Sequence, residues 1–393
     1  MGSHAAPQYV PSETRLFKPL KVGNVTLEHR IAMAPLTRLR SDDNHVPLPL
    51  MEKYYADRGC VPGTLVISEA TAIAHEEEGQ RSNPGFVSEA QTEAWRKIIS
   101  AVHANKSFFF QQIWGMGRAS DPKHLAERGF PYRSSSNVPM KGIDVEPTAL
   151  TEEEILQIIQ SFVDTAKRVV AAGGDGVEIH SAHGYLLDQF LTAGVNKRTD
   201  KWGGSIENRA RLTLAVLKAT SEAIGAEKVA VRFSPYAGFQ GSEKSDSVEL
   251  YSYIISEIKK MGLKLAYISL VEATGDPGAI VRGDKAINVG KTLDFILEAW
   301  ENRSPVMVAG AYTPESAAKA VEEHYKHWDV IVAFGRHFIS NPDLVFRVKN
   351  GIPLAPYNRA TFYLLKQWEG YNDYPFSPEF LAAHPEAVHP MTE

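Results

Sequence analysis

Short apolar segments that alternate with stretches of helical periodicity are the feature that most restricts the fold of this 393-residue chain. Each segment predicts a buried strand, and the stretch after it predicts a helical crossover, because parallel strands cannot be joined by a tight turn. Eight such units favour a closed (β/α)₈ barrel, the TIM barrel, over an open doubly wound sheet. The predicted strands span residues 30–36, 64–70, 107–114, 175–180, 228–233, 264–271, 305–310 and 329–334.

Several helix ends are marked by residues with a capping function. Thr151 and Glu154 have the spacing of a capping box, in which each side chain binds the backbone N–H of the other residue. Thr313-Pro314 and Asn341-Pro342 each place a capping residue before a proline, which is well tolerated in the first helical turn. Gly351 follows the last of these stretches and is expected to end it in the left-handed conformation.

One domain is expected to account for most of the chain. We predict a barrel over residues 15–375, preceded by a flexible N-terminal segment, 1–14, and followed by a C-terminal tail, 376–393. Residues 1–4 could be a cloning remnant. Residues 115–150 are rich in Gly, Pro, Ser and charge and lack a helical period, so we expect a capping insertion over the barrel mouth after the third strand.

The composition favours a small molecule as the partner. Lys and Arg number 42 against 47 Asp and Glu, a formal charge of −5 without a basic run, which disfavours nucleic acid. The single cysteine, Cys60, cannot form an intramolecular disulfide. The sequence has neither a signal-peptide pattern nor a window of about 18 apolar residues, so we expect a cytoplasmic protein that does not enter membranes. It is compatible with either a monomer or a homodimer.

The end of the fourth strand carries the most informative group of polar residues. In a fully extended strand, His180 and His183 would point to opposite faces, so they converge only if the strand ends at His180 and turns, as Gly184 permits. Two imidazole donors beside the Tyr185 hydroxyl would then form an oxyanion clamp with a proton donor. The alternatives are hydrogen-bonded core histidines with a packing tyrosine, or a metal site, which lacks a third ligand in the motif.

The ends of strands seven and eight predict a phosphate site. Gly310 and Ala311 follow one strand, and Gly335 and Arg336 follow the other. Barrels commonly bind phosphate at this position through backbone N–H groups, and arginine adds a charge-assisted contact. The alternative is that the glycines only mark turns and that Arg336 forms a surface ion pair.

Three further strand ends suit a planar ligand that forms hydrogen bonds. Arg232 ends an apolar strand and needs an anionic partner, which could be Glu178 or a ligand. The amide of Gln112 both donates and accepts, and Thr37 adds a hydroxyl. Together with the phosphate site, these groups predict a heterocyclic ring that is tethered by a phosphate.

The motifs over about residues 16–374 resemble the Old Yellow Enzyme family of flavin-dependent ene-reductases. Thr37 places the chain with the yeast-like branch, and it is also similar to fungal members of secondary metabolism such as ergot-pathway aldehyde reductases. The motifs that carry the resemblance are residues 16–20, 29–38, 177–190, 198–211, 232–235, 335–344 and 361–363.

The resemblance implies an FMN cofactor that lies over the barrel mouth and is reduced by NADPH or NADH. By motif position, Arg232 would face N1 and O2 of the flavin, where negative charge grows on reduction. The ring would be bound by Pro35, Thr37, Ala70 and Gln112, and the phosphate by Gly310, Ala311, Gly335 and Arg336.

The resemblance also implies a two-step exchange on an α,β-unsaturated aldehyde, ketone or nitroalkene. His180 and His183 would bind the substrate oxygen, Tyr185 would protonate the α carbon, and Tyr363 would line the pocket. Some fungal relatives have Phe in place of Tyr185 and behave as isomerases, so this tyrosine favours net reduction. The 115–150 insertion and the segment after Glu272 are expected to shape the substrate pocket.

Other functions remain open from the sequence. Within the family, these are reduction of nitro compounds or nitrate esters, and double-bond isomerisation. A sugar-phosphate lyase or isomerase could use the same phosphate site, with Glu69, Glu178 or Glu272 as its base. A non-catalytic flavin carrier is the third class.

Overall fold

Eight parallel strands form the centre of the computed structural model, which describes residues 9–273 and 290–385. The strands follow the order β4-β3-β13-β12-β11-β10-β9-β6, and β6 pairs back with β4 to close the barrel. The predicted (β/α)₈ barrel is therefore confirmed, and each strand overlaps a predicted segment. The bounds are β3 (Ile31–Met33), β4 (Leu65–Ile67), β6 (Phe108–Trp114), β9 (Gly176–Ser181), β10 (Val229–Phe233), β11 (Ile268–Val271), β12 (Val306–Ala309) and β13 (Val330–Phe334).

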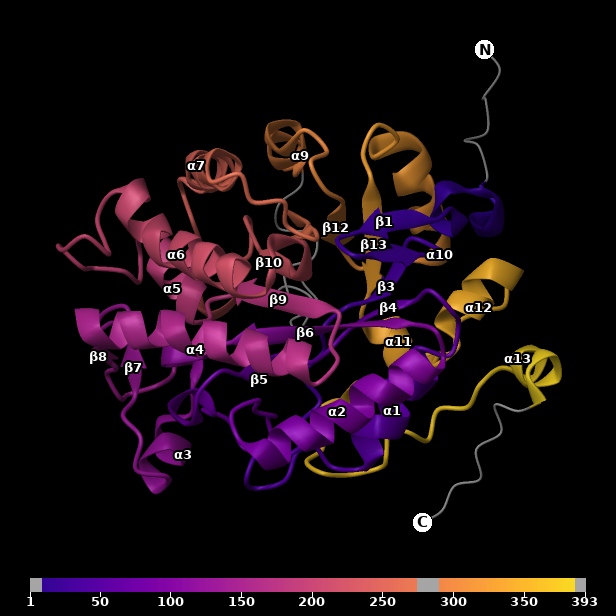
Figure 1. Ribbon diagram of the computed structural model, residues 1–393, viewed down its shortest axis with the longest axis horizontal. Helices are drawn as coiled ribbons and strands as arrows, with labels where there is room; N and C mark the ends of the chain where they lie inside the picture. The colour runs from indigo at the N-terminus through magenta and orange to yellow at the C-terminus, as the bar shows by residue number, and fades with distance from the viewer. Residues whose placement is uncertain (1–8, 274–289, 386–393) are drawn as a thin grey trace.

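Helices surround the strands and bury their apolar faces against the barrel (Figure 1). Short helices α5 (Leu186–Leu191) and α11 (Arg336–Ser340) directly follow two strand ends. None of the described helices is both long and apolar enough to cross a membrane. The outer helices are α1 (Leu50–Arg58), α2 (Glu89–Ala104), α4 (Glu152–Ala171), α6 (Ile206–Ile224), α7 (Ser247–Lys260), α9 (Asp294–Trp300), α10 (Pro314–Lys319) and α12 (Leu344–Asn350).

The capping predictions hold at three of four helix ends. The capping box of Thr151 begins α4, Thr313 caps α10, and Gly351 ends α12 in the left-handed conformation with φ +66°. The predicted start at Asn341-Pro342 is wrong, because α12 begins at Leu344 after Asp343. The Asn341 amide instead donates to His337 O at 2.8 Å and accepts from Ala355 N at 2.7 Å, so it joins α11 to the loop around Ala355.

A hairpin that the sequence analysis missed packs at the other end of the barrel. Strands β1 (Leu20–Val22) and β2 (Val25–Leu27) pair antiparallel, and their apolar side chains join the cluster that fills the barrel interior. The turn needs glycine, because Gly23 has φ +51° and a Cβ there would lie 1.9 Å from Glu227 O. The Gly-Asn pair between two short apolar runs was a signal for this hairpin.

The 115–150 insertion contains more regular structure than predicted. It includes the 3₁₀ helix η4 (Gly117–Ala119), helix α3 (Pro122–Glu127), and the paired strands β7 (Arg133–Ser134) and β8 (Thr148–Ala149). Helix α3 forms because the Asp121 side chain accepts hydrogen bonds from the first free N–H groups, before a proline. We call residues 135–147, which lie between β7 and β8, the lid.

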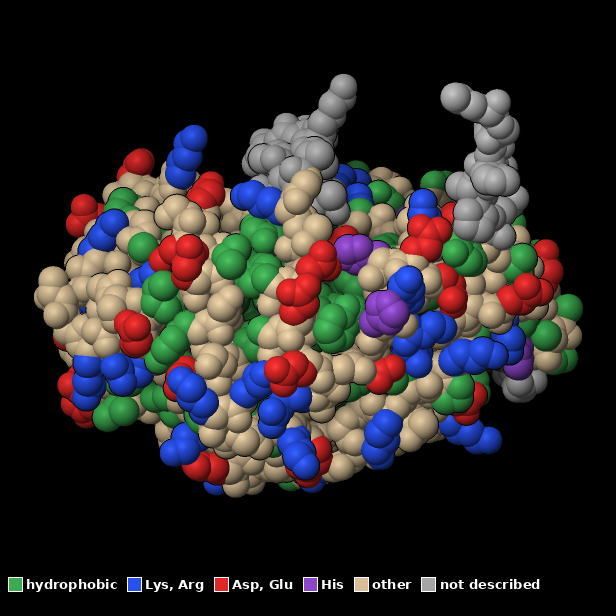
Figure 2. All heavy atoms as spheres, turned by 90° about the horizontal axis from the view of Figure 1, so that it is seen from above, with side chains coloured by type: hydrophobic (Ala, Val, Ile, Leu, Met, Phe, Trp, Pro, Cys, Tyr) green, Lys and Arg blue, Asp and Glu red, His purple; other side chains and the backbone are tan. Residues whose placement is uncertain are grey.

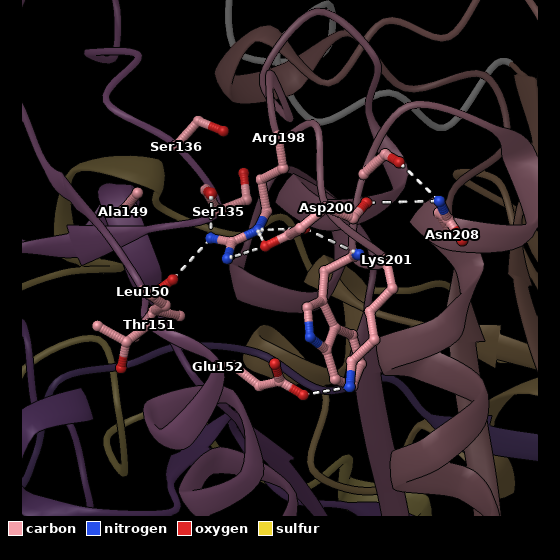
Figure 3. A network of polar contacts seen from close by, with 12 residues as sticks. Ser135, Ser136, Ala149, Leu150, Thr151, Glu152, Arg198, Asp200, Lys201 and Asn208 are labelled. Carbon is pink, nitrogen blue, oxygen red and sulfur yellow. Dashed lines mark hydrogen bonds and ion pairs between the residues drawn. The ribbon is translucent and has the colours of Figure 1, made fainter.

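One side chain holds the insertion at two points, the first residue of the lid and the residue just after β8 (Figure 3). Arg198 donates to Ser135 O at 3.1 Å and to Leu150 O at 2.6 Å, and it pairs with Asp200 at 2.6 Å. In the same segment, Lys201 forms an ion pair with Glu152 in the first turn of α4. The insertion is thus fixed to the segment between α5 and α6.

The C-terminal segment crosses the same end of the barrel as the insertion and passes α1 and α2 (Figure 1). Three buried arginines hold it by its backbone: Arg38 donates to Gly370 O at 2.6 Å, Arg40 to Gln367 O at 3.0 Å, and Arg58 to Tyr371 O at 3.2 Å. Within the predicted tail, residues 378–383 form helix α13 (Pro378–Ala383). On the face in Figure 2, basic and acidic side chains of the described residues lie interspersed.

We expect Arg40→Met to loosen this C-terminal segment. The change removes hydrogen bonds from a buried guanidinium to Phe362 O, Thr361 O, Gln367 O and Glu369 O, and should lower the free energy of unfolding by about 2 kcal/mol. Urea denaturation measures this loss, and hydrogen exchange should speed up over residues 358–372. Lys366→Met is the control, because its ion pair with Asp43 is exposed and worth within about 0.5 kcal/mol. Equal effects of both changes would contradict the anchoring role.

Candidate active site

A cavity of about 990 Å³ lies at the carboxyl ends of the barrel strands. Its wall includes every residue that the sequence analysis selected for cofactor or substrate. The lid and the C-terminal segment complete the wall through residues 142–145 and Phe362. The predicted residues that line this cavity are Pro35, Thr37, Ala70, Gln112, His180, His183, Tyr185, Arg232, Gly310, Ala311, Gly335, Arg336 and Tyr363.

The chain turns sharply after β9, as the convergence of the two histidines required. The strand continues to Ser181, one residue beyond the predicted end, and both His183 (φ +58°) and Gly184 (φ +78°) adopt the left-handed conformation. The backbone N–H of His183 donates to Ser234 Oγ at 2.8 Å, which helps to hold this costly geometry. The ring centroid of His180 lies 5.8 Å from that of His183 and 4.9 Å from that of Tyr185.

Burial keeps these three side chains uncharged at neutral pH. Burial, with the charge of Arg232 as the second cause, holds the pKa of both His180 and His183 well below 6.5. Burial also raises the pKa of Tyr185 to about 12. Nδ1 of His180 and Nε2 of His183 are buried without a hydrogen-bond partner among the described residues. The site therefore offers two neutral imidazoles and a protonated phenol.

Arg232 lies beside His180 in the register of β10 and β9 and is buried at the cavity wall. Glu178 accepts hydrogen bonds from Gln112 Nε2 at 2.7 Å and from Tyr267 OH at 2.9 Å, and its charge opposes the lowering of the Arg232 pKa by burial. Within residues 9–273 and 290–385, however, no carboxylate forms an ion pair with Arg232, and its Nε has no partner. The guanidinium can therefore bind an anionic ligand group.

The end of β12 leaves its backbone open to the cavity. A Cβ at Gly310 would lie 2.5 Å from Glu272 Oε2, so a larger residue there would displace that carboxylate. Ala311 has φ +58°, a conformation that turns the chain sharply at the cavity wall. This geometry suits close approach of a ligand to backbone N–H groups.

The end of β13 adds one free position and one cation. A Cβ at Gly335 would meet nothing closer than 3.4 Å, so the space beside it belongs to the cavity. Arg336 donates to Tyr357 OH at 2.8 Å and lies over the tyrosine ring, 5.4 Å from its centroid. Among the described residues, Arg336 forms no ion pair, which speaks against the alternative of a surface ion pair.

The three carboxylates considered as bases for a sugar-phosphate enzyme are engaged elsewhere. Glu69 is buried, accepts from Tyr55 OH at 3.3 Å, and has its pKa raised by burial to about 7, but it does not line the cavity. Glu178 lies behind Arg232. Glu272 accepts hydrogen bonds from the hydroxyls of Tyr312 and Tyr325, the latter at 2.6 Å. None of the three is among the residues that line the cavity.

The sequence analysis missed several residues of the cavity wall. Trp114 stands at the end of β6, and its ring centroid lies 4.2 Å from that of Tyr185. Phe239 and Gln240 come from the long connection between β10 and α7, where Gly238 and Gly241 flank them. The flanking glycines were the available signal. The segment after Glu272, predicted to shape the pocket, falls largely on residues 274–289, outside the described part.

Comparisons with known proteins agree with this geometry. The profile of the NADH:flavin oxidoreductase / NADH oxidase family matches residues 15–355. The chain is 48% identical to the chanoclavine-I aldehyde reductase fgaOx3 of Penicillium roqueforti (strain FM164), over 94% of this chain and 98% of that protein. It is 44% identical to the aldehyde reductase FrzD of Cladobotryum sp., over 95% and 97%. The crystal structure of Old Yellow Enzyme from Pichia sp. AKU4542 superposes with a TM-score of 0.85 at 38% identity, over 93% and 95%.

We expect neither His180 nor His183 to take up a proton near pH 6.5, where a free imidazole does. NMR of the protein with ¹⁵N-labelled histidine measures this, and His103 is the internal control, because its hydrogen bond with Asp175 raises its pKa above 6.5. Below pH 6.5 the unfolded chain binds protons at the two buried rings and the folded protein does not, so their contribution destabilises the fold as pH falls. Titration of either ring near 6.5 would show a solvated site instead.

Proposed function

The chain belongs to the NADH:flavin oxidoreductase / NADH oxidase family, as an FMN- and NAD(P)H-dependent oxidoreductase of the Old Yellow Enzyme type, and we propose that it reduces activated C=C bonds. The resemblance predicted from the sequence is thereby confirmed at the level of family, fold and cofactor. The substrates that we propose are α,β-unsaturated aldehydes and ketones and nitroalkenes. Such a reaction needs a place for the flavin, donors to the substrate oxygen and a source of a proton.

The cavity fits FMN on two observations. The buried Nε of Arg232 lacks a partner among the described residues, which is costly unless a ligand supplies an acceptor. The space beside Gly335 would be filled by any larger side chain, and it adjoins Arg336. We assign the ring to Pro35, Thr37, Ala70, Gln112 and Arg232, and the phosphate to Gly310, Ala311, Gly335 and Arg336. When bound, FMN supplies the hydride transfer from NAD(P)H to the β carbon of the substrate.

The convergence of His180, His183 and Tyr185 on the cavity is the observation that carries the proposal. Two neutral rings with free nitrogen atoms can each donate one hydrogen bond to the carbonyl or nitro oxygen of a substrate. These donors withdraw electron density from the conjugated double bond and stabilise the negative charge that develops on the oxygen. In a buried site, one such donor is worth about 10²–10³ in rate.

Tyr185 completes the reduction by giving its phenolic proton to the α carbon. A pKa of about 12 keeps this proton in place at neutral pH, so the hydroxyl is ready to donate at every turnover. The side chain of Gln240 opposes the rise in the Tyr185 pKa by hydrogen bonding, which eases release of the proton. Hydride at the β carbon and a proton at the α carbon together add H₂ across the double bond, and solvent restores the phenol.

The relatives favour aldehydes within this substrate class. Two proteins that are 48% and 44% identical to this chain are named as aldehyde reductases, one of them for chanoclavine-I aldehyde. We therefore place α,β-unsaturated aldehydes first. The cytoplasmic location and the monomeric or homodimeric state stay predictions.

We expect the purified protein to be yellow and Tyr185→Phe to slow only the second half-reaction. Anaerobic stopped-flow absorbance should show flavin reduction by NADPH within about twofold of wild type, and reoxidation by an unsaturated aldehyde at least about 100-fold slower. Heating should release FMN from both proteins. Tyr253→Phe, a change of the same kind on α7 outside the cavity wall, should leave both rates unaltered.

A colourless protein without released FMN would refute the cofactor and the reaction together. A yellow protein whose Tyr185→Phe variant reduces the aldehyde at the wild-type rate would retain the family activity but remove the proton-donor role. Product analysis by mass spectrometry distinguishes net reduction, a gain of two hydrogens, from isomerisation.

We expect His180→Ala to weaken the binding of a phenol, whose ionised oxygen resembles the charge that develops on the substrate. Loss of one hydrogen-bond donor to a charged oxygen should raise the Kd about tenfold or more. The flavin absorbance change on phenol titration measures this Kd. His103→Ala on the outer surface is the control. An unaltered Kd would show that His180 does not contact the substrate oxygen.

A further inference from the structure

Two loops that line the cavity come from distant parts of the chain. The lid contributes residues 142–145, and the connection between β10 and α7, residues 234–246, contributes Phe239 and Gln240. Gln240 lines the cavity together with Tyr185 and has φ +58°, a conformation that costs energy in a residue with a side chain. These two loops share the cavity wall with His180 and His183, which we call the histidine clamp.

One buried side chain joins the two loops. Arg118, in η4, donates to Val138 O at 3.2 Å and Pro139 O at 3.1 Å in the lid, and to Gln240 O at 2.8 Å. The residue is 4% exposed and lies next to Ala119 and Ser120, which line the cavity. In the part of the chain that the structure describes, it forms no ion pair, so the guanidinium is used to bind backbone carbonyls of both loops.

The backbone of Arg118 is fixed independently of these loops. Its N–H donates to Gln189 Oε1 at 3.1 Å, and its carbonyl accepts from Tyr132 OH at 2.6 Å. Gly117 is needed for this approach, since it has φ +57° and a Cβ there would lie 2.2 Å from Gln189 Oε1. The guanidinium therefore extends to the two loops from a fixed base, η4, which is bound to Gln189 of α5.

The second loop is shaped to receive this guanidinium. Gly241 has φ +69°, and a Cβ there would lie 3.1 Å from Arg118 Nη2. Glycine at this position therefore leaves room for the guanidinium. On its other side the same loop is held by Lys244, whose Nζ lies 2.8 Å from Asp188 Oδ1 in a fully buried ion pair. Asp188 also accepts from the N–H of Gly184, next to the histidine clamp, at 2.8 Å.

We propose that Arg118 is a positioning residue that determines which substrates fit, because it fastens the lid to the Phe239–Gln240 loop at the far end of the cavity. The inference rests on the proposed function for its substrate readout. The part of the substrate beyond the reacting double bond lies against both loops, so their separation sets how large that part can be. Small substrates, which contact only the clamp, are insensitive to it.

We test the role of Arg118 with Arg118→Met, which keeps the length but removes all donors, and with Arg118→Lys, which keeps the charge. Lys123→Met on the exposed side of α3 is the control, because it removes one cation from the same insertion. For Arg118→Met we expect KM for cinnamaldehyde to rise about tenfold with kcat within about twofold, whereas KM for 2-cyclohexen-1-one changes less than about twofold. Arg118→Lys should fall between, and Lys123→Met should match wild type.

Limited trypsin digestion of the holoenzyme provides a readout that does not depend on any activity. Lys141 is an exposed cleavage site within the lid, and the fragment starting at residue 142 identifies the cut by mass spectrometry. We expect cleavage after Lys141 to be about tenfold faster in Arg118→Met and unchanged in Lys123→Met. Unchanged cleavage in Arg118→Met refutes the fastening of the lid.

The two readouts separate the two proposals. Faster cleavage without any reduction of aldehyde or enone by wild type would refute the proposed function while retaining the fastening. Faster cleavage with equal KM changes for the large and the small substrate would refute the role in specificity. If Arg118→Met does not fold, the same two measurements on Arg118→Lys decide the case.

Discussion

The pairing of β6 with β4 is the contact on which the rest of this protein depends, because it closes an open parallel sheet into a barrel. Closure brings all eight carboxyl ends to one mouth, although the residues that they carry come from distant parts of the chain. Arg232 lies beside His180 as a neighbour in register, and the glycines that follow β12 and β13 line the same cavity. The chemistry of the site is therefore a property of topology first and of individual side chains second.

Topology also explains why the fold and the lining of the cavity could be predicted from the sequence. The positions of the strands follow from the apolar segments. In a closed parallel barrel, the residues after each segment all lie at the same end of the barrel. Gln112, Arg232 and Gly335 could be selected from the sequence on this ground. Each is a polar residue or a glycine near the end of an apolar segment, where a residue that only packed in the core would be apolar.

What could not be predicted depends on contacts without a sequence signature. Arg118, Arg40 and Arg198 all bind backbone carbonyls of distant segments, and because every residue carries such a carbonyl, these contacts have no sequence signature. The turn after the fourth strand could be predicted from the two histidines and Gly184, but the conformation of His183 within it could not. Its left-handed backbone is held by Ser234, which lies just after the next strand and comes 51 positions later.

The attachment of the insertion by Arg198 has a consequence for how this scaffold can be altered. Within the insertion, Arg198 binds only backbone carbonyl oxygens, those of Ser135 and Leu150. Such acceptors are the same whatever side chains the lid carries. The contacts of Arg198 therefore do not depend on which side chains the lid carries. Residues 140–146 can be exchanged as a cassette while the entry and exit of the chain stay fixed, which makes this loop the natural unit for redesigning the cavity without rebuilding the barrel.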